Sequence, residues 1–196
     1  MPHPSRPDRA LRSPLRRLSL AAIGASALSL LPVVCADTIP VTKAELQVDE
    51  GDVLLSAEFD FALTPALEQA LDKGIPLYFT IEFELVRTRV LWFSEKVAEW
   101  SITYRVSYTS LTRQYRVSSG LFAQTLYSLE EVQRFLSRVT SRPVARRDAL
   151  QKGSRYEAAV RLRLDVNALP KPFQISALAS RDWSMQSEWH RWSFTP

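Results

Sequence analysis

The dominant pattern along the chain is an alternation of apolar and polar side chains with a period of two. It is longest in IPLYFTIEFEL (75–85), where all six odd positions are apolar and the even positions include Glu82 and Glu84. The side chains of a strand point alternately to its two faces, so this segment predicts a strand with one buried and one solvated face. The same alternation predicts strands at 53–61, 100–108 and 156–166, and shorter strands are expected at 40–49, 113–118 and 121–127.

Two segments carry helix signals instead. Thr64 and Pro65 combine an N-cap residue with proline at the first helical position, and Gly74 ends this short helix. The sequence SLEE, which begins at Ser128, is a capping box. It opens a longer predicted helix that runs to about Thr140.

These elements indicate a mainly β fold. We expect residues 37–196 to form a single antiparallel, two-layer, sandwich-like domain with one short and one longer α-helix, because each alternating strand has one face to bury. About 160 residues are enough for a core of their own. Pro170 and Pro172 predict a loop before the last segment.

The first 36 residues have the pattern of an export signal. Five arginines precede an apolar stretch at 18–34, and the sequence VCA stands immediately before Asp37. This arrangement predicts a signal peptide over 1–36 that is cleaved off, which would place the mature chain in the periplasm. The alternative is an uncleaved anchor in the inner membrane, for which about 17 apolar residues are short. Cys35 lacks a small residue just before it, so no lipid anchor is expected.

Removing the leader changes the charge balance. It holds five of the 25 basic and one of the 21 acidic side chains, which leaves 20 of each in residues 37–196. A neutral chain gives no reason to expect nucleic acid as a partner. The net charge is nevertheless −8 over residues 37–100 and +8 over residues 101–196. We expect cross-strand ion pairs to balance much of this difference. The expected partners are Glu58, Asp60, Glu82 and Glu84 on early strands and Arg105, Arg161 and Arg163 on later ones.

Few residues suit catalysis or metal binding. After Cys35 the chain has no cysteine, and His190 is its only histidine beyond the leader. Thiol catalysis and thiolate metal sites are therefore excluded from the mature chain, and one histidine is a poor basis for a catalytic zinc site. The sequence has no phosphate-binding loop, dinucleotide fingerprint or serine-hydrolase motif. We therefore predict no catalytic residue, no metal and no cofactor.

The segment DWSMQSEWHRWSF (182–194) concentrates three tryptophans and His190. In one regular strand, Trp183 and Trp189 would share a face, and His190 and Trp192 would share the other. We expect Trp189 to point into the core and His190 to point outward without a catalytic role. Trp183 and Trp192 are candidates for ligand or partner binding, because tryptophan combines a large apolar area with one N–H donor.

Trp92 and Phe93 form a second aromatic candidate. The alternation changes parity near Val86, which indicates a bulge, and the next regular strand begins near Ala98. One interpretation is that the pair projects at the end of a hairpin and docks a partner. The alternative is that both residues continue the strand and pack.

Several segments together resemble a known family. They are the leader, TIPVTKAELQVDEGDVLLSAEFDF, ALEQALDKGIPLYFTIEFEL, SITYRVSYTSLTRQYRV and the closing tryptophans. They are similar to a proteobacterial family of exported proteins, domain of unknown function 4390, over nearly all of residues 38–194. The most distinctive parts are the run from Leu71 to Leu77 and the terminal tryptophans. The resemblance implies an exported or membrane-attached protein with a link to a membrane sensor histidine kinase, and it supplies no catalytic residues.

Three functions are compatible with these features. The first is a non-enzymatic interaction or accessory module of the cell envelope, with an envelope or membrane protein as partner. The second is a binder of a small ligand, a lipid or a saccharide, through aromatic side chains. The third is an enzyme with no recognisable motif. The lack of a recognisable set of catalytic residues favours the first of these functions.

Overall fold

The computed structural model describes residues 39–88 and 94–196. The predicted signal peptide with its cleavage site, and the pair Trp92 and Phe93, lie outside these residues. The strands are β1 (Val41–Val48), β2 (Asp52–Phe59), β3 (Leu77–Arg87), β4 (Glu95–Thr109), β5 (Gln114–Ser119), β6 (Phe122–Leu126), β7 (Arg138–Arg146), β8 (Tyr156–Leu164) and β9 (His190–Phe194). The α-helices are α1 (Pro65–Asp72), α2 (Leu129–Leu136) and α3 (Lys171–Ala179). Short 3-10 turns are η1 (Arg147–Ala149), η2 (Val166–Ala168) and η3 (Arg181–Trp183).

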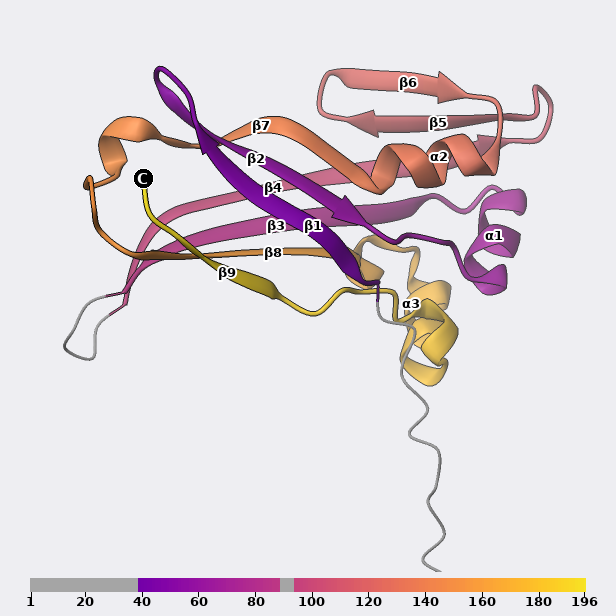
Figure 1. The fold of residues 1–196 in the computed structure, drawn as a ribbon. Coiled ribbons are helices and arrows are strands. Elements are labelled where there is room, and N and C mark those ends of the chain that lie inside the picture. The colour runs from indigo at the N-terminus through magenta and orange to yellow at the C-terminus, as the bar shows by residue number, and fades with distance from the viewer. Residues whose placement is uncertain (1–38, 89–93) are drawn as a thin grey trace, which may run out of the picture. The chain divides into compact units, whose positions relative to one another are not determined.

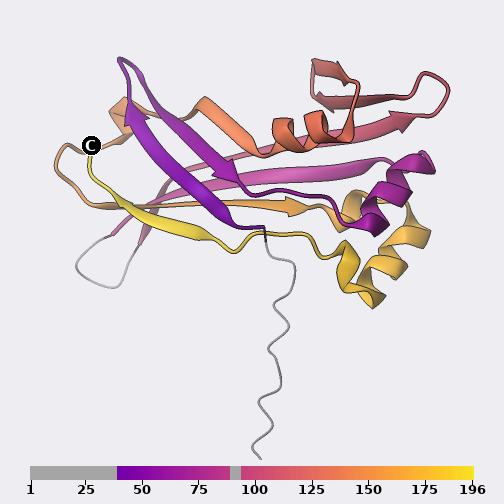
Figure 2. The same cartoon turned by 45° about the vertical axis from the view of Figure 1, so that its right-hand side comes forward.

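The described strands form two antiparallel sheets that face each other. The smaller sheet has the order β1-β2-β7, and the larger has the order β6-β5-β4-β3-β8-β9. The β1–β2 hairpin crosses the inner face of the larger sheet diagonally (Figures 1 and 2). This arrangement confirms the mainly β, antiparallel, sandwich-like fold expected from the alternation.

The core lies between the two sheets, on the faces that the alternation predicts. The central strand β3 contributes five inward side chains that are at most 1% exposed, namely Leu77, Phe79, Ile81, Phe83 and Leu85. The facing residues of β2, which are Val53, Leu55, Ala57 and Phe59, are at most 3% exposed. The short strands β1, β5 and β6 and the short helix capped by Thr64 also lie close to where the sequence predicts them.

The longer predicted helix is wrong at its C-terminal end, because a strand begins there. α2 ends at Leu136, and β7 begins at Arg138. The buried residues Val139 and Val144 are five positions apart, since the register between β2 and β7 shifts twice and Ser141 has a φ of 45°. These irregularities remove the alternation that would have revealed a strand. Pro143 is tolerated because β7 is an edge strand.

A third helix replaces the loop predicted around Pro170 and Pro172. Pro170 is the N-cap of α3, and Pro172 lies in its first turn. The first N–H groups of a helix have no partner inside the helix, so proline costs nothing at these positions. Among the described residues, no helix is long and apolar enough to cross a lipid bilayer.

An extra residue just before β9 reverses the predicted faces of the C-terminal segment. Arg163 is opposite Gln186 and Val160 is opposite His190, so three steps along β8 correspond to four along the C-terminal segment. A shift of one residue exchanges the faces of all side chains that follow. His190 therefore lies on the inner side with the buried Val160, and Trp189, which we expected in the core, turns to the outer side and is only partly buried.

Candidate functional site

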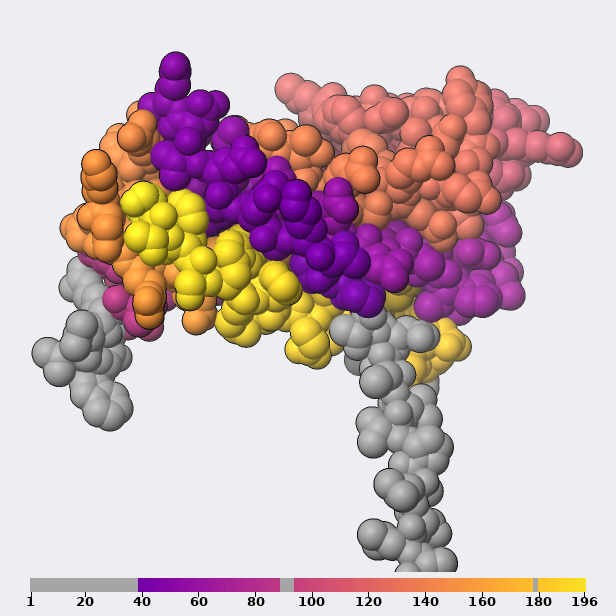
Figure 3. Space-filling view, viewed as in Figure 1, coloured from indigo at the N-terminus to yellow at the C-terminus, as the bar shows by residue number. Residues whose placement is uncertain are grey.

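A groove opens between α2, β7 and the inner face of the larger sheet near β6. It has a volume of about 520 Å³. In the space-filling view, the β5–β6 hairpin stands out beside α2 and β7 (Figure 3). The residues that line this α2–β7 groove are Ile102, Tyr104, Ser119, Phe122, Arg134, Phe135, Arg138, Val139, Thr140 and Arg142.

Helix α2 is held in place by its first turn and by its buried face. The hydroxyl of Ser128 accepts a hydrogen bond from the N–H of Glu131 at 3.2 Å, and the Glu131 carboxylate accepts one from the N–H of Tyr127 at 2.8 Å. These bonds satisfy N–H groups that the helix itself leaves free. Val132 and Leu136 are fully buried. The helix is therefore fixed at its N-terminus and along one side.

Aromatic side chains form one wall of the groove. Phe135 meets Tyr104 edge to face, with 5.3 Å between the ring centroids, and it stacks on Phe122 at 5.9 Å. Each pair has a geometry that aromatic rings favour. Phe122 begins the edge strand β6 and is 46% exposed. An apolar surface is therefore open to solvent at this end of the sheet.

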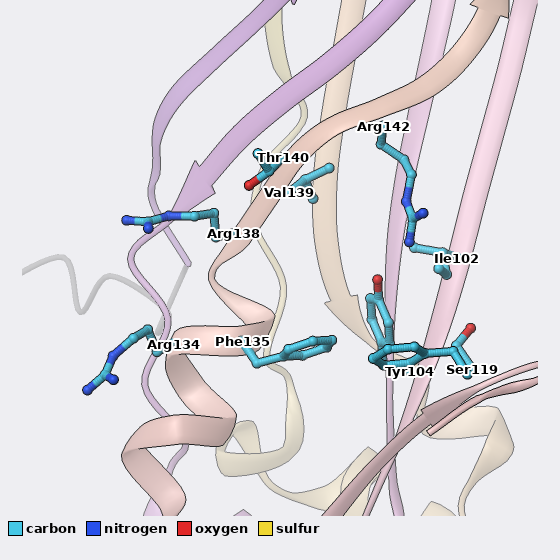
Figure 4. A pocket seen from close by; sticks show the side chains of 10 residues that line it. Ile102, Tyr104, Ser119, Arg134, Phe135, Arg138, Val139, Thr140 and Arg142 are labelled. Atoms are coloured by element: carbon cyan, nitrogen blue, oxygen red, sulfur yellow. The ribbon is translucent and has the colours of Figure 1, made fainter. Parts of the chain in front are cut away.

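Three arginines, four residues apart, supply the charge of the groove. The side chain of Arg142 reaches from β7 toward Ile102 and Tyr104 (Figure 4). The side chains of Arg134 and Arg138 lie on the opposite side of the groove and extend away from Arg142. The irregular register of β7 carries Arg142 to this position, because a regular strand would place residues 138, 140 and 142 on one face.

The three arginines differ in how far their charges are balanced. Arg138 pairs with Glu58 of β2 at 3.4 Å. Arg134 lies one turn after Glu130, whose pKa is lowered by the hydroxyl of Ser128, by its own backbone N–H and, less strongly, by the charge of Arg134. Arg142 has no ion-pair partner within 39–88 and 94–196. The groove therefore carries a positive charge that no acidic side chain among the described residues neutralises.

The outer face of the larger sheet carries a second cluster of charges. One carboxylate, Glu82 of β3, is shared by Arg161 and Arg163 of β8, with 2.9 Å between its Oε1 and Nη2 of Arg163. Burial acts to raise the pKa of Glu82, but the hydrogen bonds and charges of both arginines lower it below its ordinary value. The guanidinium of Arg161 lies 4.4 Å from the ring centre of Trp189, beside a hollow of about 160 Å³.

This outer cluster confirms part of the expected charge pairing. Glu82 pairs with later arginines as predicted, whereas Glu84 pairs with Lys96 of the neighbouring strand at 2.9 Å. Arg105 makes no ion pair with any residue that the structure describes. Because the charges around Glu82 are satisfied within the sheet, we interpret this cluster as structural.

Two of the predicted aromatic candidates, Trp183 and Trp192, lie in different parts of the structure. Trp183 is 9% exposed, and its ring centroid lies 6.0 Å from that of Phe173 of α3. Most of its surface therefore packs against other residues. Trp192 is partly buried, with its ring 6.5 Å from that of Phe83. The pair Trp92 and Phe93 lies outside the described residues. Neither Trp183 nor Trp192 lines the α2–β7 groove.

The sequence alone did not identify the groove. Its arginines lie in a segment whose second half was expected to continue a helix, and its aromatic wall joins three distant segments of the chain. The surplus of eight positive charges in residues 101–196 was the one available signal, and we expected ion pairs to balance it. Among the described residues, no group of three or more histidine, cysteine or acidic side chains could hold a metal ion.

Comparison with known proteins places the chain in a family. No curated protein and no solved structure matches it. The model of one family, described as a domain of unknown function (DUF4390), matches residues 36–193. The match covers most of the sequence and agrees with the resemblance seen in its segments. The chain therefore belongs to the DUF4390 family.

Proposed function

We propose that the protein is an exported, non-enzymatic binding module of the cell envelope and that the α2–β7 groove is its binding surface. The groove itself is the observation that carries this proposal. Its volume of about 520 Å³ falls within the range of about 300–1,000 Å³ that is usual for ligand sites. It also combines an apolar wall with a few polar groups, as such sites do.

The composition of the groove supports binding rather than catalysis. Among the residues that the structure describes, none that lines the groove carries a carboxylate, an imidazole or a thiol. These are the side chains that most often act as general acids, general bases or nucleophiles. His190 belongs to β9, where its ring lies 5.7 Å from that of Trp192. It therefore lies beside the partly buried Trp192, in a different part of the larger sheet.

The leader supports a location in the envelope. Its arginines, its apolar stretch and the VCA sequence before Asp37 have the order of a cleavable signal peptide. The periplasm is therefore the proposed site of action, and membrane proteins of the envelope, a sensor kinase among them, are the proposed partners.

Photocrosslinking in intact cells tests this proposal. A photoreactive amino acid at Thr140, which lines the groove, should yield a specific crosslinked product that mass spectrometry identifies as a lipid or an envelope protein. The same amino acid at Lys152, an exposed position outside the groove, serves as the control. Equal products from both positions, or none from Thr140, would contradict the assignment of the groove.

A second candidate is docking of an envelope protein over the β5–β6 hairpin. Two adjacent apolar side chains are exposed at the rim of the groove, with Leu121 fully exposed and Phe122 46% exposed. Exposed apolar side chains that cluster on a surface often mark an interface with another protein. Substitution of Leu121 by Ser should abolish capture of such a partner and leave the melting temperature unchanged.

A further inference from the structure

On the basis of the proposed function, we infer that the α2–β7 groove binds an amphiphile with a single anionic head, a carboxylate or phosphate joined to an unbranched apolar chain. The guanidinium of Arg142 holds the head. The apolar chain of the ligand lies along the aromatic wall formed by Tyr104, Phe122 and Phe135.

The charge of the groove selects the head group. No acidic side chain lines it, and Arg142 stands beside apolar residues without an ion-pair partner in the described chain. A guanidinium presents a planar array of N–H donors that matches the oxygen atoms of a carboxylate or a phosphate. An anionic head therefore supplies the counter-charge that the groove lacks. A cationic head would be repelled by Arg142.

The polar groups of the groove disfavour a saccharide. A sugar presents many hydroxyl donors, which require acceptors on the protein. The lining offers the hydroxyls of Tyr104, Ser119 and Thr140, but no carboxylate or side-chain amide. Its remaining side chains are apolar or are arginines, which only donate. The lining therefore suits an apolar chain with one charged end.

The volume of the groove sets the approximate length of the ligand's apolar chain. A water-sized group occupies about 30 Å³, so 520 Å³ has room for about 17 heavy atoms. This is close to the size of a single acyl chain with its head group. A lipid with two long chains would have to leave one of them outside the groove.

Isothermal titration calorimetry with the mature protein tests the inference. Four ligands with the same dodecyl chain are compared below their micellar concentrations: dodecanoate, dodecyl phosphate, dodecan-1-ol and dodecyltrimethylammonium. At least one of the two anions should bind about tenfold or more tightly than the alcohol, because a hydrogen bond to a charged group is worth that factor. The cation should bind most weakly. Comparison of the two anions distinguishes a fatty-acid source from a phospholipid source.

Two variants link the affinity to the groove. Arg142→Gln should weaken binding of the preferred anion about tenfold and leave binding of dodecan-1-ol unchanged. Arg147→Gln removes another exposed arginine, which lies outside the groove, and should change the affinity for neither ligand. Ser119→Trp fills the groove and should abolish binding of all the ligands. A circular dichroism melt of each variant confirms that it is folded.

The possible failures separate the two proposals. If the anions and the alcohol bind equally and Ser119→Trp abolishes both, the anionic head is wrong and the groove remains a binding surface. If no amphiphile binds while Thr140 crosslinks to an envelope protein, the ligand class is wrong and the partner is a protein. If neither binding nor specific crosslinking occurs, the proposed function falls together with the inference.

Discussion

The substitution Glu82→Gln measures how much the charge cluster on the outer face stabilises the larger sheet. Glu82 lies on the central strand β3, its side chain is 20% exposed, and it accepts hydrogen bonds from Arg161 and Arg163. A hydrogen bond to a charged group contributes about 1.5–3 kcal/mol, whereas an exposed ion pair contributes less than about 1 kcal/mol. The partial exposure of Glu82 places it between these cases. We therefore expect the free energy of unfolding to fall by about 2 kcal/mol, and the melting temperature by about 4–8 °C.

The effect of this substitution should depend on pH in a defined direction. Although burial alone would raise the pKa of Glu82, the two arginines hold it below the ordinary value of 4.5 in the folded chain. The unfolded chain therefore takes up the proton first as the pH falls. The stabilisation is fully present well above 4.5 and is lost as the pH falls through the lowered pKa. The melting temperatures of the original protein and the variant should consequently differ at pH 7 and converge in strong acid.

Calorimetric melts between pH 7 and pH 3 provide the measurement. Glu45→Gln is the matched control, because Glu45 pairs with Lys43 at 3.1 Å but both side chains are well exposed, at 39% and 57%. This control should cost less than about 0.5 kcal/mol. Equal losses in the two variants at pH 7 would refute the stabilising role of the cluster. If the difference in melting temperature between the original protein and Glu82→Gln stays constant down to pH 3, the assigned cause of the lowered pKa of Glu82 is refuted.

Three further predictions address the helix cap, the C-terminal segment and the leader. Ser128→Ala should lower the free energy of unfolding by about 0.5–2 kcal/mol in a denaturant titration, because it removes the N-cap of α2; no change would mean that the cap contributes nothing. A double-mutant cycle of Trp189→Ala and Arg161→Ala should give a coupling of about 0.5–1 kcal/mol, and a coupling of zero would exclude the stacking seen between them. Intact-mass analysis of periplasmic material should find a chain that begins at Asp37, and a product that retains residues 18–34 would contradict cleavage.

The sequence predicts the larger sheet well because its central strands are regular. In β3, neither face is interrupted over the five inward residues from Leu77 to Leu85, so period two is visible without knowledge of the partner strands. Local capping signals at Thr64 and Ser128 mark the starts of two helices, and they too can be recognised without knowledge of the partner elements. Each signal is confined to a few consecutive residues.

Two of the predictions that were wrong depended on irregularities set by other strands. The extra residue between Gln186 and His190 is defined only by pairing with β8, so the segment itself gives no sign that Trp189 changes face. Similarly, the left-handed backbone of Ser141 and the shifts opposite β2 make β7 look unlike a strand. The groove was missed because two of its three arginines, Arg138 and Arg142, lie on this strand.

The position of β3 between β4 and β8 has a consequence for the timing of folding. β3 ends at Arg87, but β8, which covers its other edge, begins at Tyr156, about 70 residues later. A ribosome adds about 5–20 residues each second, so one edge of the central strand stays unpaired for about 4–14 s during synthesis. In the proposed export of this protein across a membrane, the delay would allow the translocation machinery or a holding chaperone to engage the nascent chain before the core can close.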